Sequence, residues 1–339
     1  MKKVLKNIFL FVLIFVFSFC NCNTAVVNAE EHYDLEQYVE ALLIDCDVDH
    51  IISDCEPLYG FDETVIGFLY ELSPKGYVTI LCDGQITEFS LEDNFNNLAK
   101  EEKIYYSGPL SYYIKSQDSC VDLKTNKQVS RNDIIAAEES FLNKAAQISS
   151  ETLSSIETKS IVSPRIEIID SDYKTTYTPA TYSNSNNNCG PIACAILLKY
   201  YDDYVNGNIL SAYYNTSNGS RLINYFQNII DPEVVNGASY IEIADAINTY
   251  IDSVGLRSTY GAWMDYTLTF QEYKVKVERN RPVIIGVNGT HALYDDHWVV
   301  GYGYFMSNPA TYVIVNDGWG SNNVRINFNY IEEMIYLNN

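Results

Sequence analysis

The order of sequence patterns along the chain predicts an α+β fold. In the C-terminal half, helical periodicity comes first, and strand-like apolar runs follow from Pro282 onward. In the N-terminal half, two helical segments flank a series of short strands. Helices and strands segregated in this way, with no regular alternation between them, favour α+β over a parallel α/β sheet.

The first 29 residues have the features of a secretory signal peptide. Three lysines precede an apolar run from Ile8 to Phe19, and Val27-Asn28-Ala29 is a small-residue cleavage site. The apolar run is short for a membrane span. We therefore expect a secreted, extracellular protein that starts near Glu30 and has no stable membrane association in its mature form.

Residues 30–148 form the first predicted unit. It opens with a helix whose inner face carries Leu35, Val39 and Leu42. Residues 64–90 follow as two or three short strands, separated by Ser-Pro-Lys-Gly and Cys-Asp-Gly-Gln turns. A helix over residues 131–148 closes the unit.

A Ser/Thr-rich segment separates the two units. Between Ser149 and Ser163, eight of fifteen residues are Ser or Thr, and the apolar residues follow no period. Such composition is typical of linkers, which proteases cut preferentially. We therefore predict a domain boundary at residues 149–163.

The second unit is predicted to cover residues 164–339. Its first helix begins at Cys189, and its second runs over residues 239–255, with Gly255 as a stop. Thr269 and Glu272 are spaced as the capping box of a third helix. The predicted strands are residues 282–289, 298–305, 311–316 and 324–329.

Cys189 lies on the first turn of an apolar helix. Pro191 suits that turn, because its missing N–H would have no partner there in any case. The backbone N–H groups and the positive end of the helix dipole favour a thiolate, the nucleophilic form. A core position or half of a disulfide are the alternatives for Cys189. Cys194, inside the apolar run, is predicted to be a structural thiol.

His297 precedes an apolar strand, and Asp317 follows the next strand twenty residues later. Two adjacent strands can bring them together, so that the carboxylate orients the imidazole. Asn-Asp-Gly also fits an ordinary turn. His291 competes as the base, and we favour His297 because the apolar strand follows it directly.

Charge and histidine content limit the classes of partner. The chain has 44 acidic and 22 basic residues, a net charge of −22, and loss of the leader lysines makes it more negative. Nucleic acids and anionic membranes require positive charge on their protein partner, so neither is expected. The C-terminal half has only two histidines, and the chain has no CxxC pair, so we expect no metal and no other cofactor.

Three blocks, CGPIACAILLKYY, HWVVGYGY and YVIVNDGWG, together resemble a papain-like cysteine peptidase. More narrowly they resemble the bacterial bacteriocin-leader-peptidase-like branch, with streptopain as a more distant relative. The resemblance covers about residues 175–330. It implies a papain-like fold, in which the nucleophile's helix packs on a bent antiparallel sheet, and hydrolysis of a peptide or protein substrate.

The same resemblance implies a role for each residue. Cys189 would attack the carbonyl carbon, His297 would accept and return the proton, and Asp317 would orient His297. The oxyanion-hole glutamine of the family has no counterpart here, and Asn184 is the expected donor in its place. Trp319 would cover the contact between His297 and Asp317 from water.

The N-terminal unit is similar to pro-domains of streptopain-like secreted peptidases through GYVTILCDGQITEFS and KIYYSGPLSYY. This similarity implies a zymogen in which the N-terminal domain is an intramolecular inhibitor. Two alternatives to the peptidase remain open. One is an inactive papain-like scaffold that serves as a secreted binding or surface protein, and the other is a transamidase or isopeptidase with the same three residues.

Overall fold

The computed structural model of this 339-residue chain describes residues 29–93, 103–116, 119–158, 173–175, 177–183, 188–230, 238–265, 268–287, 297–307 and 310–338. The predicted leader lies outside these residues, except for Ala29. In the part of the chain described, no helix combines the length and the apolar character needed to cross a bilayer.

Within the described residues, the N-terminal half places eight strands between two helices. Its elements are α2 (Ala29–Asp45), β1 (Ile51–Tyr59), β2 (Val65–Ser73), β3 (Tyr77–Leu81), β4 (Ile86–Ser90), β5 (Ile104–Tyr106), β6 (Tyr112–Lys115), β7 (Cys120–Asp122), β8 (Gln128–Val129) and α3 (Arg131–Thr158). The side chains of Leu35, Val39 and Leu42 are buried, which confirms the predicted inner face of α2. The strands expected within residues 64–90 are β2, β3 and β4.

Helix α3 extends further than the sequence pattern predicted. It continues to Thr158, so residues 149–158 of the expected linker are helical, and residues 159–163 lie outside the described residues. The Ser149 hydroxyl donates to Asp83 Oδ2 (2.5 Å) and accepts from Gln85 Nε2 (2.6 Å), which anchors this part of the helix. Once a helix is nucleated, each further residue adds a hydrogen bond at small cost, so polar turns can continue it.

The C-terminal half contains the remaining elements. They are β9 (Tyr173–Lys174), α4 (Cys189–Tyr204), α5 (Ser220–Ile230), α6 (Tyr240–Ser253), β10 (Gly261–Asp265), α7 (Phe270–Glu278), β11 (Val283–Val287), β12 (His297–Ser307), β13 (Ala310–Asn316), β14 (Val324–Asn327), the 3-10 turn η2 (Phe328–Tyr330) and β15 (Ile331–Asn338). The capping box of Thr269 and Glu272 is present, and Gly255 follows α6 with a φ of +74°. Both observations confirm the predicted helix ends.

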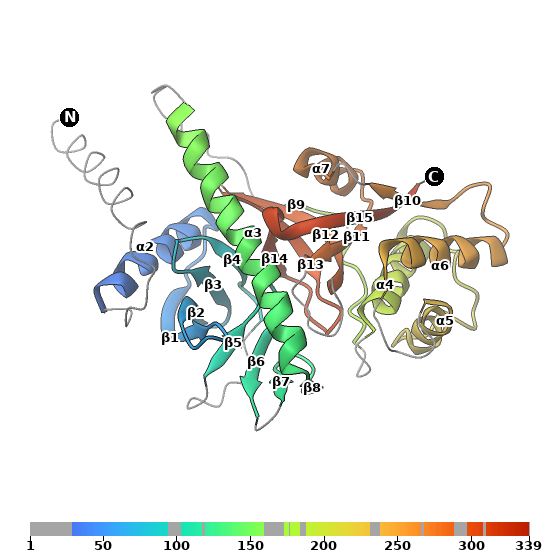
Figure 1. Cartoon of the computed structure of the whole chain (residues 1–339). Helices are drawn as coiled ribbons and strands as arrows, with labels where there is room; N and C mark the ends of the chain where they lie inside the picture. The colour runs from blue at the N-terminus through green and yellow to red at the C-terminus, as the bar shows by residue number, and fades with distance from the viewer. Residues whose placement is uncertain are drawn as a thin grey trace, which may run out of the picture.

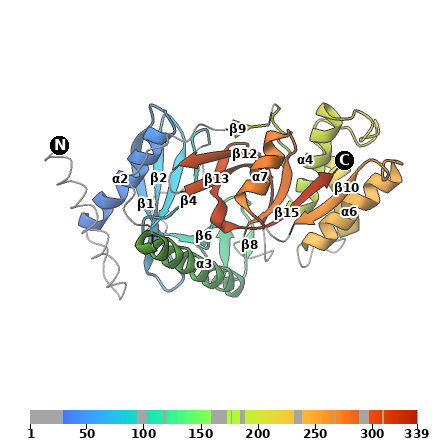
Figure 2. The same cartoon turned by 90° about the horizontal axis from the view of Figure 1, so that it is seen from above.

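One sheet crosses the whole molecule. Its strand order is β10-β15-β11-β12-β13-β14-β4-β3-β2-β1-β5-β6-β7-β8, with β9 paired to β12. The two halves join where β14 pairs antiparallel with β4, which sets Val324 opposite Ser90 and Ile326 opposite Glu88. Figure 1 shows α2 at one end of this arrangement and α4, α5 and α6 together at the other, and Figure 2 shows α2 and the pair α4 and α6 at the same two ends.

The hydrophobic core also crosses the seam between β4 and β14. One buried cluster combines Tyr77, Tyr106 and Phe141 of the N-terminal half with Val313 and Tyr330 of the C-terminal half. Each buried Å² of apolar surface contributes about 25 cal/mol to stability, so separating the halves would be costly. The two predicted units are therefore joined by a sheet and a core as well as by the connecting segment.

Helix α4 is buried along most of its length and packs on β11 and β12, which run antiparallel to each other. An apolar sequence of this kind is expected for a helix that is covered on several sides. The α+β class predicted from the sequence is confirmed, and α4 brings Cys189 to the sheet.

Candidate active site

Three segments that are far apart in the sequence meet around the start of α4. Cys189 is the first residue of α4, His297 is the first residue of β12, and Asp317 follows β13. Cys189 shares a buried cluster with Trp298, the neighbour of His297. A Cβ atom added at Gly318 would lie 3.6 Å from Ile192 Cγ2. The fold thus brings the cysteine, histidine and aspartate segments into one region.

Gly190 allows the first turn of α4 to approach its neighbours closely. A Cβ atom at this position would lie only 2.9 Å from the Cβ atom of Ala238. The Ala238 carbonyl accepts a 2.7 Å hydrogen bond from Trp298 Nε1. Through Ala238, the N-terminal end of α4, where Cys189 lies, is therefore connected to the start of β12.

The amide groups at the start of α4 favour an anion. Pro191 has no N–H, and the Ile192 N–H donates to the Asn188 carbonyl (3.0 Å). The first N–H groups of a helix point toward its N-terminal end and take no part in its own i to i−4 hydrogen bonds, and the Asn188 side chain forms no capping hydrogen bond to α4. These amides and the helix dipole can stabilise a thiolate at Cys189 or an oxyanion beside it.

The imidazole of His297 is fully buried and is oriented by two contacts. Its Nε2 atom lies 3.2 Å from the carbonyl oxygen of Asp317. Because a carbonyl can only accept, Nε2 carries the proton, and Nδ1 is then the acceptor nitrogen that a general base needs. The Trp319 ring stacks on the imidazole with centroids 4.0 Å apart and planes 2° from parallel. The face of an indole also attracts a cationic imidazolium.

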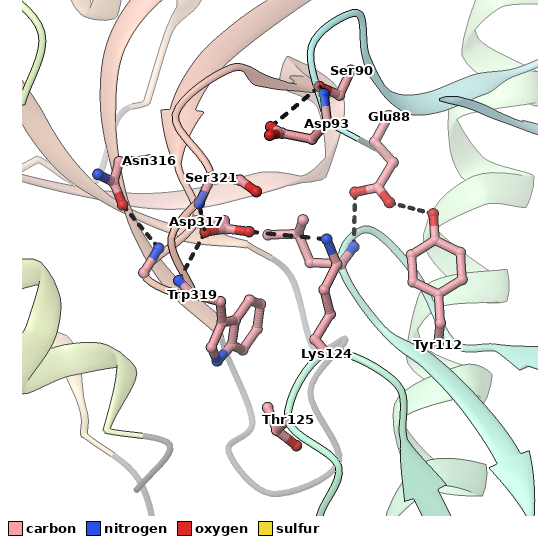
Figure 3. Close-up of polar contacts among 12 residues, drawn as sticks. Glu88, Ser90, Asp93, Tyr112, Lys124, Thr125, Asn316, Asp317, Trp319 and Ser321 are labelled. Atoms are coloured by element: carbon pink, nitrogen blue, oxygen red, sulfur yellow. Dashed lines mark hydrogen bonds and ion pairs between the residues drawn. The ribbon is translucent and has the colours of Figure 1, made fainter. Parts of the chain in front are cut away.

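We expected the Asp317 carboxylate to orient His297, but the backbone carbonyl of Asp317 makes this contact instead. Oδ1 accepts from the N–H groups of Trp319 (2.8 Å) and Ser321 (3.0 Å), and Oδ2 lies 3.9 Å from Lys124 Nζ (Figure 3). The side chain closes the turn after β13, as the alternative interpretation of Asn-Asp-Gly proposed. In this structure Asp317 therefore orients His297 through the backbone of the turn.

Asn316, which we did not single out from the sequence, fixes the other side of that turn. Its Oδ1 accepts from the Gly318 N–H (3.0 Å), and its Nδ2 donates to the Ala180 carbonyl (3.0 Å). Ser183 forms a β-bridge with Trp319. The turn is thereby attached to the segment that leads into Cys189. An asparagine beside Asp-Gly could have indicated this role.

Burial shifts the pKa of two groups near the site, the Asp317 carboxyl and the Cys194 thiol. Burial raises the pKa of the Asp317 carboxyl, and Lys124 and the two turn amides oppose that rise. Burial also raises the pKa of the Cys194 thiol far above its usual value. Cys194 is therefore neutral and inert at physiological pH, in agreement with the structural role predicted for it.

Two predicted residues, Asn184 and His291, lie outside the described residues. The cysteines within the described ranges form no disulfide, so Cys189 is not half of one. Among the same residues, no three His, Cys, Asp or Glu side chains gather in a way that could hold a metal ion.

Comparison with known proteins finds a family that the C-terminal half of the chain resembles. A model of the Peptidase_C39 like family matches residues 173–338. Among solved structures, a C39-like peptidase from Bacillus anthracis aligns with a TM-score of 0.31 and 13% identity, over 49% of this chain and 98% of that chain. A structure from a study of the mite allergens Blo t 1 and Der p 1 aligns with a TM-score of 0.28 and 14% identity, over 55% and 77%.

No curated protein matches the chain. The family match covers the Cys189, His297 and Asp317 blocks and is slightly longer than the resemblance predicted over residues 175–330. The match of residues 173–338 to the C39-like family model confirms the predicted resemblance of this part of the chain to a papain-like cysteine peptidase.

Proposed function

We propose that this protein is a secreted cysteine peptidase that hydrolyses peptide bonds with Cys189 as nucleophile and His297 as base. The proposal is supported by a cysteine at the start of a buried helix and an oriented imidazole at the start of β12, in segments that share one buried cluster through Cys189 and Trp298. The helix amides favour the thiolate, and the Asp317 carbonyl sets the ring orientation.

The proposed reaction has two steps. In the first, Cys189 Sγ attacks the carbonyl carbon of the scissile bond, and the amine leaves with a proton that His297 had taken from the thiol. In the second, His297 removes a proton from water, which attacks the acyl-enzyme and releases the acid and the thiol. In both steps Trp319 excludes water from the buried face of the imidazole.

Asn184 is proposed to donate to the oxyanion together with the Cys189 N–H. An asparagine amide can take the place of the family glutamine, because both offer an N–H₂ donor. We expect Asn184→Ala to lower kcat by about 10²–10³ with little change in KM, as for loss of one preorganised donor. Steady-state kinetics on a peptide substrate measure this, with Asn186→Ala as the matched control. An unchanged kcat would show that other donors fill this role.

Selective alkylation tests the proposed nucleophile. At pH 6, iodoacetamide should modify Cys189 at least about 100-fold faster than Cys194, because only Cys189 lies where a thiolate is favoured. Mass-spectrometric mapping at successive times gives both rates in the same molecule. Slow and equal modification of both thiols would contradict the peptidase and would favour the inactive scaffold.

We also propose that residues 1–29 are removed on secretion and that the chain is made as a zymogen. Activation would require a cut between Thr158, where α3 ends, and Tyr173, where β9 begins, since regular elements resist proteases. The shared sheet and core support a specific form of this proposal. The N-terminal half would inhibit through the uncut connection and would stay bound after the cut.

A further inference from the structure

A lysine from the N-terminal half contacts the active-site turn. Lys124 Nζ lies 3.9 Å from Asp317 Oδ2, and the two side chains are 17% and 1% exposed. A carboxylate buried to this degree keeps its charge only with hydrogen bonds and a compensating cation. The turn amides provide the hydrogen bonds, and Lys124 provides the cation across the seam between the halves (Figure 3).

The backbone that carries Lys124 is held firmly. Asp122 Oδ1 accepts from the N–H groups of Lys124 (2.8 Å) and Thr125 (2.9 Å), which closes the turn between β7 and β8. Leu123 is buried in the shared core, and its N–H donates to the Tyr112 carbonyl (2.9 Å). The backbone that carries the lysine side chain is therefore fixed by its neighbours.

Among the described residues, Glu88 and Asp93 are acids that act on the Asp317 carboxylate beside Lys124. Glu88 on β4 accepts from the Leu110 N–H (2.8 Å) and from the Tyr112 hydroxyl, and burial raises its pKa to about 7. Asp93 after β4 raises the pKa of Asp317, and Lys124 lowers the pKa of both Glu88 and Asp317.

Tyr77 on β3, whose ring centroid lies 5.8 Å from Lys124 Nζ, is kept neutral by burial, which raises its pKa. On the far side of the turn, His297 contacts the Asp317 carbonyl. Lys124 thus compensates a cluster of carboxyl groups at the seam.

The turn transmits this contact to the imidazole. The Asp317 carboxylate fixes the N–H groups of Trp319 and Ser321, while the carbonyl of Asp317 and the ring of Trp319 both contact His297. Loss of the lysine would release or neutralise the carboxylate, and both contacts to His297 would shift with the turn. Small misplacement of a catalytic group is enough to slow a reaction strongly.

We propose that Lys124 is a positioning residue of the active site, which holds the Asp317 carboxylate and through it the orientation of His297. The N-terminal half is then a working part of the peptidase and has to remain bound after any activating cut. The proposal rests on the proposed function of Cys189 and His297.

The test compares Lys124→Gln with Lys127→Gln, which removes the same charge from the same β7–β8 turn, and with Lys124→Arg. We expect Lys124→Gln to lower kcat about 10- to 100-fold with KM within about twofold. The acid limb of its pH profile should move to higher pH, because Asp317 loses the cation that favours its charged form. Lys127→Gln and Lys124→Arg should keep the wild-type profile. In a Glu88→Gln background, Lys124→Gln should move the acid limb of the pH profile by the same amount. This result would exclude Glu88 as the titrating group.

The rate of Cys189 alkylation against pH gives a readout that needs no turnover. In Lys124→Gln, the acid limb of this alkylation profile should also move to higher pH. Such a shift would support the positioning role even if the wild type is alkylated at Cys189 but hydrolyses no peptide. The absence of hydrolysis would then contradict only the proposed peptidase activity. Superimposable profiles of Lys124→Gln and the wild type would overturn the positioning role. Equal losses in Lys124→Gln and Lys127→Gln, or in Lys124→Arg, would overturn it too. A thermal melt of each variant identifies one that does not fold, and Lys124→Arg then carries the test.

Discussion

Cys189→Ala should abolish peptide hydrolysis, with a loss in kcat of about 10⁴-fold or more, while the protein stays folded. The loss is large because the proposed acyl-enzyme forms on the Cys189 thiol, which alanine lacks. Cys194→Ala is the matched control. It removes a fully buried thiol in the same helix, so it should lower the free energy of unfolding by about 1 kcal/mol and leave kcat nearly unchanged.

Cys189→Ala also tests the zymogen proposal. Purified wild type should convert to a form whose new N-terminus lies between Thr158, where α3 ends, and Tyr173, where β9 begins. The two fragments should co-elute, since β4 remains paired with β14. Cys189→Ala should stay full length. Conversion of the alanine variant at the wild-type rate would indicate a contaminating protease, and full activity of uncut wild type would show that the first half is no inhibitor.

Local signals in the sequence predicted most of the described helices but fewer than half of the described strands. Thr269 and Glu272 form the expected capping box, and the apolar runs after Pro282 became β11 to β14, since buried strands have few other ways to satisfy their backbone groups. Helix α5 was missed, although Leu222, Ile223, Phe226 and Ile230 form its buried face at helical spacing. A systematic count of that period would have found it.

The arrangement of the two halves could not be predicted in this way. The pairing of β4 with β14 joins residues more than two hundred positions apart, and no local pattern specifies which edge strand another will select. For the same reason, no local sequence pattern indicated Lys124 as a partner of Asp317. The end of α3 was wrong because tertiary contacts of Ser149 outweigh the weak preference of a Ser/Thr-rich segment.

The site was predicted at the level of residue types and segments. Cys189, His297 and Trp319 lie where the helix start, the strand start and the turn suggested. The direction of the Asp317 side chain depended on a competition that the sequence does not resolve. The Asp317 carboxylate contacts two backbone amides and a lysine that is distant in the sequence, and it does not contact the imidazole. The Asp317 carbonyl contacts His297 in its place.

His297→Ala should lower kcat by about three to five orders of magnitude, because the thiol loses its base and the leaving amine loses its proton donor. His291→Ala, which removes the competing histidine six positions earlier, should keep most of the turnover. Both variants are measured on the same peptide substrate, with a thermal melt to show that each is folded.

Iodoacetamide distinguishes the loss of a base from a general disturbance of the site. Without the imidazolium at residue 297, the thiolate fraction of Cys189 at pH 6 should fall, and its alkylation should slow by about 10-fold or more, while at pH 9 the rates should converge. A merely loosened site would instead expose the thiol and speed alkylation at both pH values. If His291→Ala were the variant without turnover, the base would come from the segment before β12, and the contact between His297 Nε2 and the Asp317 carbonyl would serve only to pack the turn against the sheet.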